Sequence, residues 1–155
     1  MAQQLWLLRH GEAVPHESGP DDARELTERG RDQARSAGHA LHALEVEVHL
    51  CFTSPKVRAR ETAELACADL RVDPVDEASL AEGFDGRAAL ELMAAAGADQ
   101  RVLVVGHEPD FSQVVYDLTG GRVDFKKGGL AGVRLDGSRG ELIVLLRPRE
   151  TDRIR

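Results

Sequence analysis

The sequence has little of what membrane-spanning, secreted and nucleic-acid-binding proteins need. Its longest purely apolar runs, 92–96 and 142–146, are five residues each, whereas a membrane-spanning helix takes about 20. The two cysteines, Cys51 and Cys67, form neither a CxxC pair nor a disulfide framework, so we expect reduced thiols in the core. Acidic residues outnumber basic ones, 27 against 20, and the resulting formal charge of -7 disfavours binding to nucleic acid or anionic membranes. The apolar stretch 5–8 is too short for a signal-peptide core, so we expect a cytoplasmic protein.

What is present is typical of one compact domain. The chain has 155 residues, of which 42% are hydrophobic and 30% are charged, enough to bury a sizeable core. No stretch has the composition of a linker or the period of a repeat array. We therefore expect a single domain over residues 1–146, followed by a polar C-terminal tail at 147–155.

The spacing of apolar residues predicts strand–helix units in the first half of the chain. The run 5–8 is typical of a buried strand and the polar stretch 11–25 of a long loop. A helix is expected to follow, with Thr27 as its N-cap. A second unit has a strand at 49–53 and a helix at 56–70, for which Ser54-Pro55 supplies the expected N-cap and first helical position.

The second half continues the alternation and ends in two strands that form a hairpin or meander. The expected helix, strand, helix and final two strands lie at 86–96, 102–105, 111–118, 130–135 and 141–146. The sequence therefore predicts the α/β class, with three layers and a mixed, mostly parallel central sheet.

Residues with unusual chemistry follow three of the predicted strands. They are Arg9-His10-Gly11, Ser54-Pro55 with Arg58, and Gly106-His107. In open α/β sheets ligands bind outside the carboxyl ends of the strands, so these residues can meet in one crevice. Guanidinium groups and helix N-termini suit phosphate oxygens. The pattern favours a phosphoryl site that needs no metal and no cofactor.

At these residues the sequence resembles the histidine phosphatase superfamily, also called the phosphoglycerate mutase-like family. Arg9-His10-Gly11 is similar to its Arg-His-Gly signature, and 54–63 to its Ser-Pro-x-x-Arg-Ala-x-x-Thr-Ala helix start. The segment 105–107 is similar to its second-histidine motif, and 26–30 to its Leu-Thr-x-x-Gly helix start. The resemblance extends over 5–146. The short chain and Gly106-His107-Glu108-Pro109 are similar to the small SixA-type phosphohistidine phosphatases.

The resemblance implies a role for each matching residue. His10 would be the nucleophile that forms a phosphohistidine intermediate. Arg9, Arg58 and His107, the last as a cation, would bind the phosphoryl oxygens and stabilise the transition state. Gly11 is expected beside the phosphate because a residue without Cβ lets the backbone approach closely, although an ordinary turn glycine fits equally well.

The general acid has two candidates, Asp21 in the polar loop and Glu82 after the second helix. Asp21 is the better match to an aspartate of SixA-type chains, and Glu82 is a loose match to a glutamate of larger family members. A solvated loop carboxylate is the alternative interpretation for both.

The function that the resemblance implies is a cofactor-independent phosphatase, with a phosphohistidine on a protein as its expected substrate. The alternatives are a phosphatase or mutase of small phosphate esters, such as sugar or nucleotide phosphates, and a phosphoprotein-binding module without turnover. The sequence contains no P-loop and no Gly-x-Gly-x-x-Gly motif. It predicts neither the physiological substrate nor the oligomeric state.

Several further residues have simpler interpretations. We expect Trp6 in the core of the first strand. His39 and His42, three residues apart on a helix, are expected at the surface rather than in a metal site. His16 is expected to be solvated, or else at the rim of the crevice. The pair Lys126-Lys127 is expected in a solvated turn, with contact to an acidic partner as the alternative.

Overall fold

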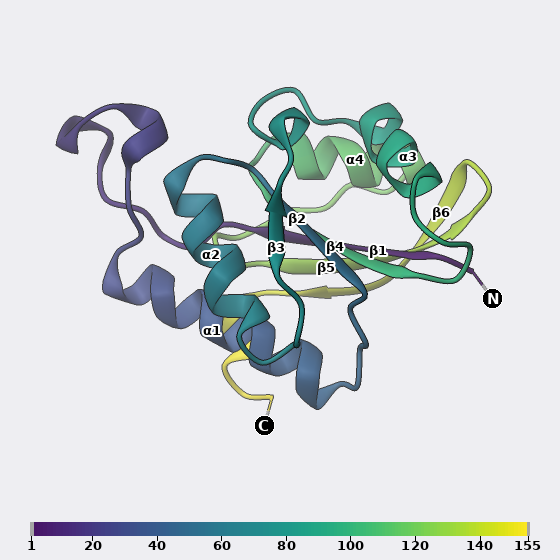
Figure 1. Cartoon of the computed structure of the whole chain (residues 1–155), viewed down its shortest axis with the longest axis horizontal. Coiled ribbons are helices and arrows are strands. Elements are labelled where there is room, and N and C mark those ends of the chain that lie inside the picture. The colour runs from purple at the N-terminus through teal and green to yellow at the C-terminus, as the bar shows by residue number, and fades with distance from the viewer. Residues whose placement is uncertain (1, 155) are drawn as a thin grey trace.

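The computed structural model describes residues 2–154 and has helices on both faces of a six-stranded sheet (Figure 1). The strand order is β3-β2-β4-β1-β5-β6. Strands β1 to β4 pair in parallel, whereas β5 pairs antiparallel with both β1 and β6. The expected α/β class with a mixed, mostly parallel sheet is confirmed. The strands are β1 (Gln4–Arg9), β2 (Leu50–Thr53), β3 (Pro74–Asp76), β4 (Arg101–Gly106), β5 (Leu130–Asp136) and β6 (Arg139–Leu146).

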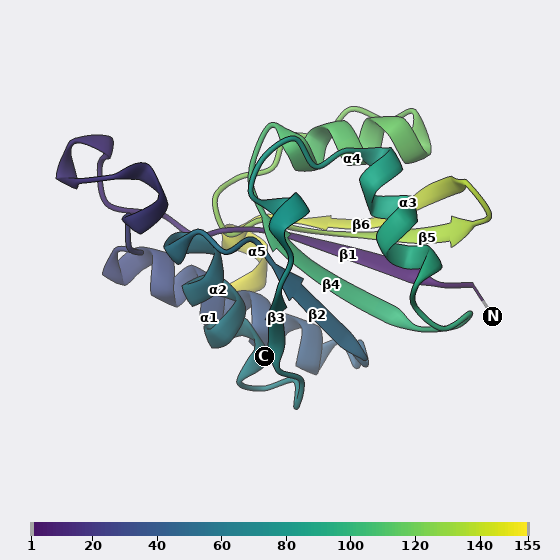
Figure 2. The same cartoon turned by 45° about the horizontal axis from the view of Figure 1, so that its top comes forward.

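The helices form the two outer layers. Figure 2 shows α1 and α2 on one face of the sheet and α3 and α4 on the other. Three short 3-10 turns lie in the connections, and the loop that carries the first two extends beyond the end of the sheet (Figure 1). The helices are α1 (Glu28–Ala43), α2 (Val57–Cys67), α3 (Gly86–Ala94), α4 (Asp110–Thr119) and α5 (Pro148–Thr151), and the turns are η1 (His16–Ser18), η2 (Asp21–Ala23) and η3 (Ala78–Leu80).

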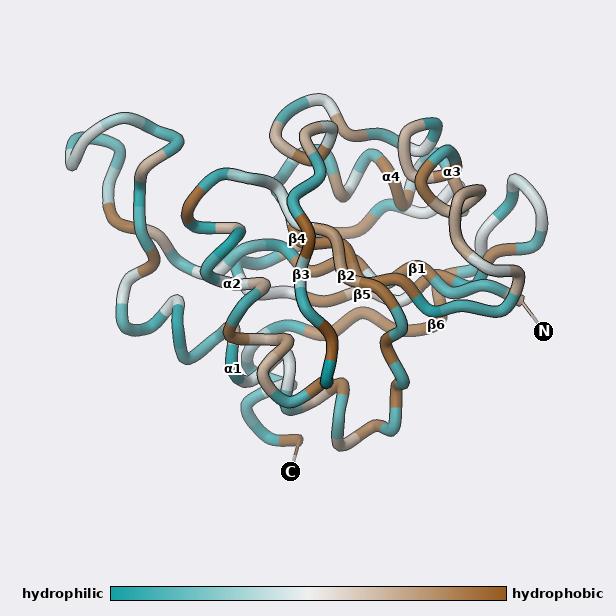
Figure 3. Tube along the Cα trace, in the orientation of Figure 1, coloured by the Kyte–Doolittle hydropathy of each residue, from teal (hydrophilic) through white to brown (hydrophobic). Residues whose placement is uncertain are grey.

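Alternation along the central strands divides the core in two. On β1, Leu5 and Leu7 pack in the cluster that includes α3 and α4, whereas Trp6 and Leu8 pack in the cluster that includes α1 and α2. Hydrophobic residues accordingly follow the strands through the middle of the molecule (Figure 3). The predicted core position of Trp6 is confirmed. Both cysteines are free and buried, as expected.

The first helix begins as predicted, but the second does not. The Thr27 side chain accepts a hydrogen bond from the N–H of Gly30 at 3.0 Å and so caps α1. Helix α2 begins only at Val57, with Lys56 at the N-cap position, and ends at Cys67 rather than at 70. The expectation that Ser54 caps this helix is wrong. Its hydroxyl instead lies 2.8 Å from Nε2 of His107.

The C-terminal segment contains a helix that the sequence did not predict. In α5 the N–H of Arg147 donates to the Glu150 carboxylate at 2.9 Å. Thr151 is buried, and α5 packs against α1 (Figure 2). The segment expected as an irregular polar tail therefore covers part of the domain.

Within residues 2–154 the structure has no helix that is long and apolar enough to cross a membrane.

The contact between α1 and α2 allows no side chain at Gly38. A Cβ there would overlap the carbonyl oxygen of Ala66. We predict that Gly38→Ala lowers the free energy of unfolding by about 1 to 3 kcal/mol, because overpacking against backbone outweighs the helix propensity of alanine. Urea unfolding measures the change. His39→Ala, at the adjacent exposed position of α1, is the control and should change stability little. A Gly38→Ala variant as stable as wild type would contradict this close approach.

Candidate active site

A pocket of about 250 Å³ lies where β1 and β4 end. Of the residues predicted for the site, it contains His10, Arg9, Arg58, His107 and Asp21. Neither Gly11 nor Glu82 lines it, and Glu82 is exposed in the connection before α3. The complete lining consists of Arg9, His10, Ala13, His16, Asp21, Arg24, Arg58, His107, Glu108 and Lys127.

His10 has one ring nitrogen fixed and the other available. Its Nδ1 lies 2.7 Å from the carbonyl oxygen of Gly11, and because a carbonyl can only accept, Nδ1 carries the proton. Nε2 therefore keeps its lone pair in the neutral ring. Burial, together with the nearby charges of Arg58 and Arg9, lowers the pKa of His10 to about 4. The ring is thus neutral, and its Nε2 nucleophilic, at neutral pH.

Gly11 does not line the pocket, but its backbone contacts fix the carbonyl that accepts from His10. Its N–H donates to the Thr62 hydroxyl at 3.1 Å, and that hydroxyl donates to the carbonyl of Arg58 at 2.7 Å. A Cβ on Gly11 would meet the backbone of Gly30 in α1. The structure therefore gives Gly11 a packing role between β1 and the two helices, and the expected phosphate contact stays a prediction.

His107 lies beside His10, with 5.2 Å between the ring centroids. Its Nε2 is 2.8 Å from the hydroxyl of Ser54, which also accepts a hydrogen bond from the N–H of Lys56. Burial first, and then the neighbouring His10 and Arg58, lower the pKa of His107 to about 3. The expected cationic His107 is therefore not the form present in the unliganded pocket at neutral pH.

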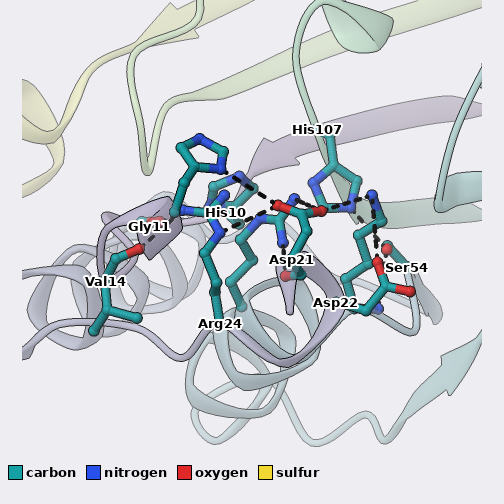
Figure 4. A network of polar contacts seen from close by, with 11 residues as sticks. His10, Gly11, Val14, Asp21, Asp22, Arg24, Ser54 and His107 are labelled. Atoms are coloured by element: carbon teal, nitrogen blue, oxygen red, sulfur yellow. Dashed lines mark hydrogen bonds and ion pairs between the residues drawn. The ribbon is translucent and has the colours of Figure 1, made fainter. Parts of the chain in front are cut away.

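Asp21 joins the cationic side chains of the pocket (Figure 4). Its backbone carbonyl accepts from Arg58 Nη1 at 2.8 Å, and its carboxylate lies 3.3 Å from Arg58 Nη2. The same carboxylate is 3.2 Å from Arg24 Nε and 3.3 Å from Lys56 Nζ, and His16 Nδ1 is 3.7 Å away. The η2 turn thus places one anion among several cations.

These contacts decide the protonation state of Asp21. Desolvation by itself raises the pKa of the carboxyl, but the charges of Arg58 and Lys56 outweigh it and lower the pKa to about 2. Asp21 is therefore ionised at neutral pH. In this form it has no proton to donate, and the acid role expected for it stays a prediction.

Three buried nitrogens of the pocket residues have no hydrogen-bond partner within residues 2–154. They are Arg9 Nε, Arg58 Nε and His107 Nδ1. When Ser54 donates its hydroxyl proton to Nε2 of His107, the ring proton of the neutral histidine is on Nδ1. Buried donors without acceptors are costly, and all three belong to cationic or imidazole side chains that line the pocket. The pocket is therefore suited to an anion with several acceptor oxygens.

Sequence reasoning missed Arg24, Lys127 and the role of Ser54. Arg24 is in a loop without periodicity, and its side chain is fixed by a bond from Nη1 to the carbonyl of Val14 at 2.9 Å. Lys127 reaches the pocket from the loop before β5, which is distant in the sequence. Ser54 carried a signal, its place in the Ser-Pro motif, but the motif was interpreted as a helix cap.

A neutral histidine among arginines at strand ends of a mixed α/β sheet defines a site for phosphoryl chemistry. Residues 5–89 match the histidine phosphatase superfamily (branch 1). The chain belongs to this superfamily, and it is a hydrolase with phosphatase activity. This confirms the family predicted from the three motifs.

The relatives include small proteins of similar length. An uncharacterized protein of Picosynechococcus sp. is 30% identical over 94% of this chain and 97% of its own. Phosphohistidine phosphatase SixA of Escherichia coli is 28% identical over 87% of each chain. The solved structure of the protein histidine phosphatase SixA complexed with tungstate superposes with a TM-score of 0.87 at 26% identity, over 95% of this chain and 98% of that one.

The two buried histidines predict how stability depends on pH. An unfolded histidine has a pKa of about 6.5, whereas His10 and His107 have folded values of about 4 and 3. Below pH 6.5 the unfolded chain therefore binds more protons, so we expect stability to fall as pH drops from 7 to 5. Asp21 has a pKa of about 2 in the folded protein. Its protonation therefore adds to this loss of stability only below about pH 4.

Thermal unfolding at pH 7, 6 and 5 tests this expectation. The double variant His10→Gln/His107→Gln should lose much of the decrease in melting temperature seen for wild type. The matched control is His39→Gln/His42→Gln, which removes two exposed histidines of α1 and should retain the decrease. Equal pH dependence in all three proteins would contradict the neutral state assigned to the buried rings.

Proposed function

We propose that this phosphatase hydrolyses phosphohistidine on a protein, with His10 as the nucleophile. One observation carries the proposal. The bond from Nδ1 of His10 to the Gly11 carbonyl leaves Nε2 with a lone pair in a pocket of cations. Neither an exposed nor a protonated histidine would serve as well for attack on phosphorus.

The reaction takes two displacements. The Nε2 lone pair of His10 attacks phosphorus, a P–N bond to His10 forms, and the bond from phosphorus to the substrate imidazole breaks. The substrate ring reacts in the form that carries a proton on its other nitrogen, so the departing nitrogen keeps the electron pair and the leaving group is a neutral imidazole. Water then attacks the phosphorus on His10, the P–N bond breaks, and inorganic phosphate and free His10 are released.

Arg9, Arg58 and His107 bind the phosphoryl oxygens in this scheme, and Arg24 joins them. Charge spreads over these oxygens in the transition state, so preorganised donors lower the barrier. A dianionic phosphoryl group beside His107 also favours the charged ring and raises its depressed pKa. His107 can therefore donate either as a neutral ring through Nδ1 or as a cation once the substrate is bound.

The state of Asp21 favours a phosphohistidine over a phosphate ester. An alkoxide leaving group needs a proton in the transition state, a contribution of roughly 10² to 10⁴-fold. Asp21 is ionised, and Glu82 lies outside the pocket. An imidazole leaves without such help, so the ionised state of Asp21 suits a P–N bond. The likeness to SixA proteins, one of which binds tungstate, supports the same substrate class.

The nucleophile is tested by substitution. We predict that His10→Ala abolishes turnover in a folded protein, because no neighbouring side chain supplies an equivalent lone pair. Arg58→Ala and His107→Ala should lower kcat by roughly 10² to 10³-fold, since each removes a donor to the developing charge. Steady-state kinetics with an aryl phosphate, with His39→Ala as the control, provide the measurement. Turnover by a folded His10→Ala protein near the wild-type rate would exclude this mechanism.

The substrate class is tested by a panel assayed with one preparation. It consists of a phosphohistidine protein, a phosphoserine peptide, a sugar phosphate and an aryl phosphate. We predict the highest kcat/KM for phosphohistidine, because its leaving group needs no acid. A sugar phosphate or phosphoserine peptide with an equal or higher kcat/KM would instead support the phosphatase of small esters or of phosphoserine. Binding of phosphoprotein without phosphate release would support a binding module.

A further inference from the structure

A second, larger depression of about 550 Å³ adjoins the pocket and shares Arg9 and Lys127 with it. It lies between the start of α1, the loop before β5 and the start of α5, and we call it the basic groove. Two carboxylates, Glu12 and Asp124, line it together with six cationic side chains. The six are Arg9, Arg29, Lys126, Lys127, Arg147 and Arg149.

The basic groove is positive in a protein that is negative overall. Six cations and two carboxylates leave an excess of four positive charges, against a formal charge of -7 for the whole chain. The two carboxylates are already engaged, Glu12 with Arg29 at 3.7 Å and Asp124 with Lys126 at 2.9 Å. Glu150 pairs with Arg147 and Arg149 from outside the lining. Lys127 has no ion-pair partner within residues 2–154.

The loop that carries the lysines is joined to the strand end that carries His10. The N–H of Gly128 is 3.1 Å from the carbonyl of Arg9 and 3.0 Å from that of His10. Arg9 Nη1 in turn donates to the carbonyl of Phe125 at 2.7 Å. The basic groove therefore has a fixed position relative to the nucleophile. A molecule with its phosphoryl group at His10 can extend directly into the groove.

We infer that the basic groove binds an acidic segment of the protein that carries the phosphohistidine. The inference rests on the proposed function and specifies the partner. The cations of the basic groove are spread along it and largely solvated. Their side-chain exposures are 78% for Arg29, 70% for Arg149 and 59% for Lys126. A small anion would need converging, buried donors. Dispersed exposed charges instead match a row of carboxylates, and they attract it over a distance of about 8 to 10 Å.

Two phosphohistidine peptides that differ only in their flanks test this inference. One has flanks rich in aspartate and glutamate, and the other has serine and glutamine in their place. We expect wild type to prefer the acidic peptide by roughly tenfold in kcat/KM at low salt, with the preference declining as sodium chloride is added.

Arg29→Glu/Arg149→Glu reverses two charges of the groove that lie outside the pocket. We expect a roughly tenfold lower kcat/KM for the acidic peptide, mainly through KM, since each exposed charge pair contributes up to about fivefold. Hydrolysis of the neutral peptide and of an aryl phosphate should stay unchanged. The matched control is Arg87→Glu/Arg139→Glu, which gives the same net charge at exposed positions outside the groove. Like Arg29, Arg87 pairs with a glutamate, at 3.5 Å.

Binding of the acidic peptide without its phosphate, followed by fluorescence anisotropy, tests the groove independently of turnover. Weaker binding by the groove variant than by the control variant supports the inference. Equal binding by the two variants, or no preference between the two flanks, overturns it. The inference is also overturned, in favour of a small ligand, if the groove variant loses activity only on a sugar bisphosphate. Failure to hydrolyse either phosphohistidine peptide would overturn the proposed substrate, whereas the anisotropy result would still decide the role of the groove.

Discussion

The hydrogen bond from Nδ1 of His10 to the carbonyl of Gly11 is the contact on which the rest of the site depends. It selects the tautomer in which Nε2 has a lone pair, and it fixes the orientation of the ring. The carbonyl is itself held, because the Gly11 N–H is bound to Thr62 of α2 and the Gly11 backbone lies against Gly30 of α1. The packing of two helices on one face of the sheet therefore sets the direction of a single nitrogen.

The electrostatics of the pocket balance two opposing requirements. A phosphoryl group needs cations close by, yet the same cations and the same burial must keep the nucleophilic ring unprotonated. The unliganded protein accommodates Arg58, Arg24 and Lys56 by placing the Asp21 carboxylate among them. Under the proposed function, an incoming phosphoryl group would compete with this carboxylate for the arginines. Asp21 thus acts as an internal counter-ion, a role that depends on its ionised state.

Much of the fold could be predicted because its signals are local. The apolar run 5–8 specifies β1, the Thr27 cap specifies the start of α1, and the apolar stripe specifies α4. None of these signals depends on distant residues. The three motifs at strand ends could likewise be identified from sequence order, and the topology brings them together. Helix α5 was not predictable, since four residues give no helical period and its position depends on packing against α1.

The parts of the site that could not be predicted depend on contacts between residues that lie far apart in the sequence. Asp21 was a candidate only by resemblance, and because it and Arg24 lie in a loop without a period, nothing in the sequence showed that η2 folds back onto Arg58. The neutral state of His107 follows from burial beside His10 and Arg58, which a motif does not encode. Ser54 was expected to satisfy a helix end, but its hydroxyl instead joins Lys56 to His107.

Under the proposed function, contacts that the motifs do not encode restrict the choice of substrate more than the motifs do. The motifs provide the proposed nucleophile and the proposed phosphoryl-binding set, which would serve for esters and phosphoramidates alike. The ionised Asp21 disfavours leaving groups that need a proton. No residue between 62 and 106 lines the pocket within the described chain, so the long connection from α2 to β4 does not cover it. Within the described residues the loop that carries η1 and η2 forms the cover, and the positive groove beside the pocket fits the proposed substrate, a side chain on a protein surface.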